Sequence, residues 1–311
     1  MISEHLESWL GFPVQPLGFE ELNEDLPDLS RTICRLYIGW ESEGPFTELF
    51  SRFLELKGVD STPGLIIGAY AGDDSGAEST ETVELLVNAH TRLRSLRGIF
   101  LGDIISEENE ISWIQQSDVS PLFAAYPQLE NLAVRGGNGL TLGRVVHDKL
   151  KSLVVQSGGL PRSVLADIAA SRFPNLEHLE LWLGTDNYGW DGTVADLQPL
   201  LDPQQFPRLR TLALRNSEIQ NEVVAAVAHA PIVTQLETLD FSMGNLSDVG
   251  GEALLKSPQL SRLKKLDLHY HYLSPEMEAR IRQAFPNADL SDRQEPDKYG
   301  DEVYRNIAVS E

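Results

Sequence analysis

The chain has 311 residues, 41% of them hydrophobic, and its 47 acidic and 25 basic residues give a formal net charge of −22. A negative field of this size repels phosphate groups, so we expect neither nucleic acid nor an anionic membrane as a partner. The first residues are acidic and lack the apolar run of a signal peptide, no run of 18 apolar residues occurs, and the sequence holds a single cysteine, Cys34, so we expect a cytoplasmic protein without disulfides.

A recurring apolar phrase organises most of the chain. Residues 1–30 precede it, and we expect them to form a capping arm. From residue 31 to residue 291 the phrase Leu-x-x-Leu-x-Leu recurs every 20 to 35 residues or so, a period typical of solenoids. The copies begin, from clean to degraded, at Leu176, Leu209, Leu236, Leu263, Leu129, Leu150, Leu96, Ile33, Leu65 and Phe285. The phrase predicts about ten leucine-rich repeats, followed by a tail over 292–311.

Helical patterns lie between the copies. They are visible over 221–230 and 248–256, and a further helix is expected after Ser274-Pro275. The short interval between Leu132 and Leu153 contains a glycine-rich stretch, which predicts tight turns there instead of a helix. Strands alternating with wider helices give a parallel sheet that curves toward its strand side. The predicted fold class is therefore an α/β leucine-rich-repeat solenoid, a horseshoe with the curved parallel sheet on the concave face and helices on the convex face.

The first half of the expected concave floor is apolar. Side chains alternate across a strand, so the residue between the last two leucines of each copy faces the concavity. In the first half these residues are Tyr37, Ile66, Phe100, Ala133 and Val154. An apolar sheet face needs a cover. The N-terminal arm, the loop over 102–120, the C-terminal tail and another protein are all open alternatives.

The second half of the floor is polar, with Glu180, Arg215, Asp240, Asp267 and His269. Trp182 is expected to stand exposed at its centre, and an exposed Trp is a good binding anchor. Arg135 and Arg215 are expected beside it, free to fork onto a partner's carboxylates. Tyr188 and Trp190 lie on the adjacent loop, over 184–192. These aromatic residues either help to build a binding site or pack together to plug the loop.

Two chemical readings of the polar half are possible. Asp267-x-His269-x-His271 resembles metal ligands at alternate strand positions, but the direction of His271 is uncertain and a hydrogen-bonded floor is the simpler reading. No Gly-x-Ser-x-Gly motif occurs, and Cys34 has no histidine near it in sequence. We therefore predict no catalytic residue, no metal and no cofactor. The alternative is a small-molecule or metal site on the floor, possibly catalytic.

The charge is unevenly distributed. Residues 1–120 hold 22 acidic and 7 basic residues, whereas residues 121–288 hold 18 and 15. Acidity of this kind serves solubility, or it attracts a basic partner to the acidic half. Both readings stay open.

Several longer phrases carry a resemblance to known sequences. They are Ser3-Glu-His-Leu, Ile111-Ser-Trp-Ile, Leu179-Glu-Leu-Trp-Leu-Gly-Thr-Asp, Leu266-Asp-Leu-His-Tyr-His-Tyr-Leu and Ala308-Val-Ser-Glu. Over its whole length the chain resembles an uncharacterised family of bacterial leucine-rich-repeat proteins. The resemblance implies the horseshoe fold and transfers no functional residue. Because a curved sheet makes a broad and open groove, we predict a non-enzymatic scaffold that binds another protein or a peptide through its concave face and strand-end loops.

Overall fold

A single sheet of twelve strands, arranged in chain order, runs through the computed structural model, which describes residues 2–23, 26–39, 42, 44–72, 76–300 and 302–311. The strands β1 and β2 pair antiparallel, and the following pairs, such as β8 with β9, are parallel. The strands are β1 (Ser8–Trp9), β2 (Phe12–Leu17), β3 (Ile33–Leu36), β4 (Gly64–Ile67), β5 (Gly98–Leu101), β6 (Asn131–Arg135), β7 (Ser152–Gln156), β8 (His178–Gly184), β9 (Thr211–Ser217), β10 (Thr238–Asp240), β11 (Lys265–Asp267) and β12 (Ala288–Asp289). A separate hairpin joins β13 (Asp297–Tyr299) to β14 (Glu302–Tyr304).

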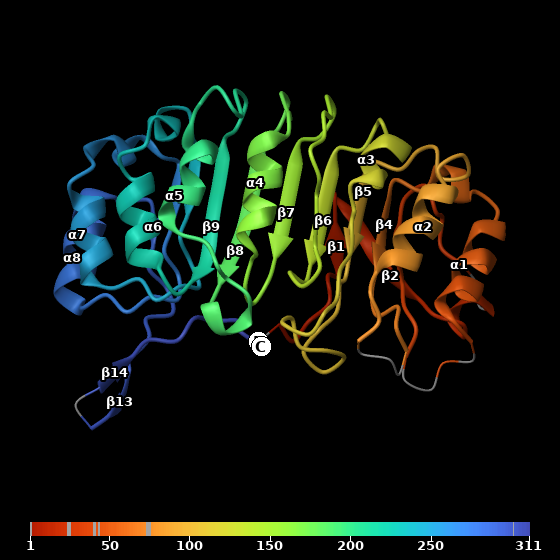
Figure 1. The fold of residues 1–311 in the computed structure, drawn as a ribbon, viewed down its shortest axis with the longest axis horizontal. Coiled ribbons are helices and arrows are strands. Elements are labelled where there is room, and N and C mark those ends of the chain that lie inside the picture. The colour runs from red at the N-terminus through yellow and green to blue at the C-terminus, as the bar shows by residue number, and fades with distance from the viewer. Residues whose placement is uncertain (1, 24–25, 40–41, 43, 73–75, 301) are drawn as a thin grey trace.

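The α-helices cover one face of the sheet (Figure 1). They are α1 (Phe46–Glu55), α2 (Thr80–Asn88), α3 (Pro121–Ala125), α4 (Arg162–Ala170), α5 (Val194–Leu197), α6 (Gln220–Val227), α7 (Asp248–Leu255) and α8 (Pro275–Ala284). Short 3-10 helices are η1 (Glu21–Asn23), η2 (Val59–Ser61), η3 (Asp186–Tyr188), η4 (Gln198–Leu201), η5 (Pro231–Thr234) and η6 (Pro258–Arg262). No helix within these described ranges is long and apolar enough to cross a membrane. The α/β class and the parallel, solenoid-like order of strands and helices are confirmed.

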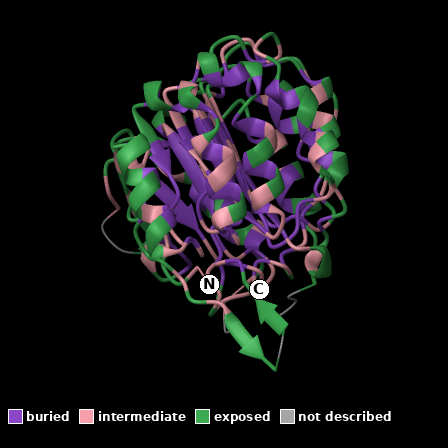
Figure 2. Ribbon diagram, turned by 90° about the vertical axis from the view of Figure 1, so that its left-hand side faces the viewer, coloured by how far each residue is buried: buried purple, intermediate pink, exposed green. Residues whose placement is uncertain are grey.

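The leucines of the phrase form the core between the sheet and the helices. Leu153, Leu179, Leu212 and Leu239 lie side by side in the parallel register and are fully buried. Figure 2 shows the buried interior between the strands and the outer helices. The described residues between β6 and β7 form turns and isolated bridges without a helix, as the glycine-rich stretch there predicts.

One predicted register is wrong. In β3 the residue beside Leu65 is Cys34, and Arg35 lies beside Ile66. The floor position therefore belongs to Arg35 and not to Tyr37. The first copy, which begins at Ile33, has apolar residues at several neighbouring positions. The phrase can therefore be aligned to this copy two residues too far along the chain.

The N-terminal arm covers the apolar half of the floor, by which we mean the sheet face opposite the helices. Trp9 packs on Phe100 with ring centroids 6.2 Å apart, and the arm's apolar residues join Ile66 and Ala133 in one cluster. Gly98 leaves room for this contact, because a Cβ there would lie 2.4 Å from Leu10 Cδ1. Of the four covers left open by the sequence, the arm is the one observed. Within the predicted arm, residues 1 and 24–25 lie outside the described residues.

Candidate functional site

The polar half of the floor is a row of charged side chains from neighbouring strands. Asp240, Asp267 and Asp289 occupy one register row on β10, β11 and β12, beside Ala213 of β9. Glu180 occupies the same row on β8. Because adjacent parallel strands place equivalent residues about 4.8 Å apart, the fold brings these carboxylates together. The sequence predicted Glu180, Asp240 and Asp267 on this face. We call this set, with Arg215, Lys265 and His269, the charged floor.

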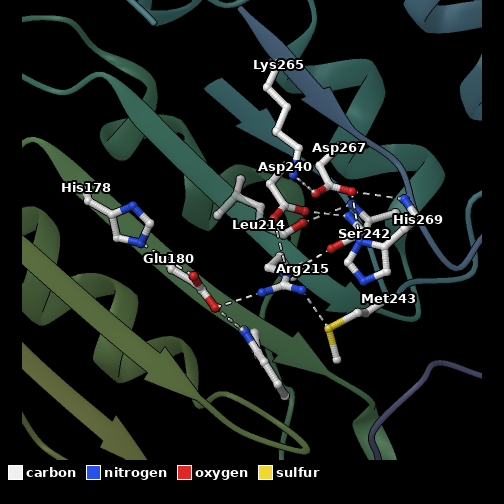
Figure 3. Close-up of polar contacts among 12 residues, drawn as sticks. His178, Glu180, Leu214, Arg215, Asp240, Ser242, Met243, Lys265, Asp267 and His269 are labelled. Carbon is white, nitrogen blue, oxygen red and sulfur yellow. Dashed lines mark hydrogen bonds and ion pairs between the residues drawn. The ribbon is translucent and has the colours of Figure 1, made fainter. Parts of the chain in front are cut away.

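Arg215 links Glu180 to Asp240 within the charged floor (Figure 3). Its Nη1 donates to Glu180 Oε1 at 3.1 Å, and its Nε lies 3.4 Å from Asp240 Oδ2. The same Nε donates to Ser242 Oγ at 2.8 Å. The guanidinium is therefore already bound to carboxylates of its own chain. The expected free fork for a partner's carboxylate is not present.

Glu180 is a strongly stabilised carboxylate of this set. Its Oε1 accepts from Trp182 Nε1 at 2.7 Å, and its Oε2 lies 3.4 Å from His178 Nε2. Burial alone would raise the pKa of Glu180. The contacts with His178 and Arg215 outweigh burial and lower the pKa to about 2. Glu180 is therefore ionised throughout the physiological range.

Asp267, on β11, is the centre of a second polar cluster of the charged floor. His269 Nδ1 lies 2.8 Å from Asp267 Oδ1, and Lys265 Nζ donates to Oδ2 at 2.6 Å. Burial opposes ionisation of Asp267, but these two partners hold the pKa of its carboxyl below the usual range. The hydrogen bond with Asp267 raises the pKa of His269. Burial raises the pKa of the neighbouring Asp240.

The Asp267-x-His269-x-His271 pattern does not converge on one point. His271 is fully buried, its Nε2 lies 3.3 Å from the Leu290 carbonyl oxygen, and its Nδ1 accepts from the Leu273 N–H at 3.2 Å. It therefore faces the interior, whereas His269 faces the floor. Among the described residues no group of three or more His, Cys, Asp or Glu side chains could hold a metal ion. Cys34 is also buried, which raises the pKa of its thiol to about 12.

Trp182 does not stand exposed, contrary to expectation. Only 5% of it is accessible, and it packs with Ile111 and Val309, the latter from the C-terminal tail. The guanidinium of Arg215 lies 5.4 Å from its ring centroid. The sequence does not show that the tail returns to this point, so the indole could not be recognised as covered. While the tail is in place, Trp182 is not available as an anchor.

Arg135 belongs to a different, buried cluster. Its Nη1 lies 3.4 Å from Asp103 Oδ1, and its Nε donates to Gln156 Oε1 at 2.8 Å. Arg35 reaches the other oxygen of Asp103 at 3.3 Å. Arg135 is 3% exposed, so the expected exposed pair of arginines beside Trp182 does not exist.

Tyr188 and Trp190, on the loop over 184–192, lie in different environments. Trp190 is buried in the main core, whereas the Tyr188 hydroxyl hydrogen-bonds the carboxylate of Glu311. Trp190 therefore packs into the core by itself, and the expected packing of the aromatic residues against one another is not observed. Tyr188 instead contacts the tail.

Asn216 and the tail that it holds are not predicted by the sequence. Asn216 is fully buried, and its side chain accepts a hydrogen bond from the Val309 N–H at 3.0 Å. The only available signal was the alternation of Ile307 and Val309 at the polar end of the chain. That alternation indicates burial on one side but does not say against what.

The fold and the charged floor thus define an α/β protein of solenoid-like architecture. Among solved structures, it is similar to the crystal structure of a protein from Bacteroides fragilis, with 39% sequence identity and a TM-score of 0.76. The match covers 79% of this chain and 70% of that one, and the chain belongs to the same family as that protein. No protein-family model and no curated protein matches the chain.

Proposed function

We propose that the chain is a leucine-rich-repeat horseshoe that serves as a non-enzymatic scaffold, and that it binds another protein or a peptide on its charged floor. The single observation that supports this most is the division of the floor. The apolar half is sealed by the chain's own arm, whereas the side chains of Lys265 and His269 remain 52% and 31% exposed. Exposed polar side chains on a rigid sheet suit recognition by contact.

The charges favour a basic partner segment. Glu180, Asp240, Asp267 and Asp289 outnumber Arg215 and Lys265, and Arg215 is already bonded within the floor. A lysine or arginine of a partner would find carboxylates held in place, which lowers the entropy cost of binding. The predicted partner chemistry therefore shifts from carboxylates toward cations.

A small-molecule or catalytic site is the second candidate. It rests on the Asp267–His269 hydrogen bond of 2.8 Å, because a carboxylate that orients a histidine is a common element of acid–base chemistry. The openness of His269 favours the scaffold, since catalysis benefits from a closed site that excludes water.

A peptide-array screen tests the scaffold. We expect the retained peptides to be rich in Lys and Arg and to be released by salt. The double variant Asp240→Asn/Asp289→Asn should weaken their binding about tenfold, as expected for the loss of one or two charge-assisted hydrogen bonds. The matched control Glu222→Gln/Glu276→Gln removes two exposed charges from α6 and α8. Equal binding by both double variants would contradict the proposal.

A further inference from the structure

The last residues of the chain return to the body of the protein after an excursion. The hairpin of β13 and β14 projects away from the sheet, and the chain then runs back along the carboxyl ends of the strands (Figure 1). Ile307 is 7% exposed and Val309 is 3% exposed, whereas the hairpin residues Tyr299 and Tyr304 are 71% and 46% exposed. The tail is therefore packed into a groove on the body of the protein.

The groove holds the tail mainly by its backbone. The Asn306 carbonyl oxygen accepts from the Tyr272 hydroxyl at 2.8 Å, and the Ala308 N–H donates to the Met243 carbonyl oxygen at 2.9 Å. The side-chain amide of Asn216 then takes both backbone groups of Val309: it accepts from the N–H and donates to the carbonyl oxygen. An amide that pairs in both directions acts like the edge of a neighbouring β-strand. These contacts would hold any extended peptide of suitable shape.

The residues that line the groove include two with strained backbone conformations and a glycine that lies very close to the tail. Asn216 and Met243 have φ of 52° and 69°, a left-handed conformation that costs energy in residues other than glycine. Such strain persists where the surrounding structure requires it, and it often marks a binding site. A Cβ on Gly158 would lie 2.4 Å from the Ser310 carbonyl oxygen, so glycine leaves room for the tail's backbone. Ile111 and Trp182 form the apolar wall against Val309.

The hairpin of β13 and β14, which connects the tail to the body of the protein, does little to hold the tail in place. The residues of β13 and β14 are exposed throughout, and an isolated two-stranded hairpin is marginally stable in water. The contacts within the groove must therefore supply most of the stabilisation of the seated tail. A segment held in this way can exchange with a competitor of the same chemistry.

We propose that this groove, which we call the tail groove, is a peptide-recognition site that the chain's own C-terminal segment occupies. Its ligand class is an extended peptide with branched apolar residues at positions i and i+2 and small residues at i+1 and i+3, as in Ile307-Ala308-Val309-Ser310. A partner protein that carries such a segment displaces the tail. The tail groove lies beside the charged floor, and peptide recognition there is a function separate from the one proposed for the charged floor. The contacts between the tail groove and its peptide do not include Asp240 or Asp289.

A labelled synthetic peptide with the sequence of residues 305–311 tests the proposal by fluorescence anisotropy on the full chain. The variant Ile307→Asp/Val309→Asp should release the tail and bind the peptide at least tenfold more tightly than the unmodified chain. Adding Asn216→Gly, which removes the amide and tolerates the positive φ, should weaken binding about tenfold. A peptide with Asp at both apolar positions should not bind.

Two outcomes overturn the proposal. One is a released variant that keeps the melting profile of the unmodified chain and yet fails to bind the peptide. The other applies if that variant does not fold, and it uses the unmodified chain. Excess peptide should displace the tail and so accelerate hydrogen exchange at the Val309 amide. Unchanged exchange would contradict the proposal. The variant Asp240→Asn/Asp289→Asn should bind this peptide normally when the tail is released. Failure of the charged floor as a binding face is therefore distinguishable from failure of the tail groove.

Discussion

Arg35 and Asp103 meet beneath the N-terminal arm, 68 positions apart in the chain, with Arg35 Nε 3.3 Å from Asp103 Oδ2. Asp103 is fully buried, and its other oxygen faces Arg135 at 3.4 Å. Asp103 thus faces two buried guanidiniums, and one of them, Arg35, also pairs with Glu108 Oε1 at 3.0 Å. The pair links strand β3 to the loop that follows β5, at the place where the arm folds over the floor.

Replacing Asp103 by Asn should destabilise the protein by about 3–5 kcal/mol, because the buried Arg135 would lose its ion pair and Arg35 would be left with Glu108. Chemical denaturation measures this free energy of unfolding. Asp60→Asn is the control, since its ion pair with Arg94 is largely exposed and should contribute less than about 1 kcal/mol. Similar losses for the two variants would contradict the role given to Asp103.

The core leucines give a second prediction. Leu212 and Leu239 are fully buried in neighbouring strands, so Leu212→Ala and Leu239→Ala should each cost about 2–5 kcal/mol. In a solenoid each repeat contacts only its neighbours, so the damage should be local. Hydrogen exchange should show lost protection in β9 to β11 and normal protection in β3 to β5. Uniform loss over the whole sheet would argue against solenoid behaviour.

The arm gives a third prediction. Gly98→Val should push Leu10 and Trp9 off the floor, because even a Cβ at this position overlaps them. The uncovered apolar floor should then bind a hydrophobic dye, and the arm should become sensitive to protease. Gly39→Val is the control, since a Cβ there meets nothing within 4 Å. Dye binding that does not differ between the two variants would show that the arm does not seal the floor.

The sequence predicted the solenoid-like order of strands and helices, since the phrase positions the buried leucines of neighbouring strands directly. It also placed Glu180, Asp240 and Asp267 on one face, because strand alternation determines which side a residue takes. It could not place Trp182 or Arg135 correctly. Their environment depends on the arm, the loop after β5 and the tail, which lie outside the repeat and return over long chain distances. Such contacts leave no periodic pattern in the sequence.

Acid should weaken the charged floor. The pKa of Glu180 is depressed to about 2 in the folded protein, below its unfolded value near 4.5. A depressed pKa means that ionised Glu180 contributes stability above the unfolded pKa, and that this contribution is lost as pH falls toward the folded pKa. Glu180→Gln should therefore destabilise the protein at pH 7 and make little difference near pH 2. Thermal melts of both proteins across this range measure the effect; a difference independent of pH would contradict it.

Site-specific photo-cross-linking tests most directly whether the charged floor is the binding face. A photoreactive amino acid replaces Lys265, whose side chain is 52% exposed on the floor, or Val249, which is 71% exposed on α7 on the helix side. Irradiation in cells, followed by mass spectrometry, identifies what each position touches. We predict a discrete cross-linked partner from position 265 and none from position 249. A partner captured from position 249 and not from position 265 would place binding on the helices and contradict this account.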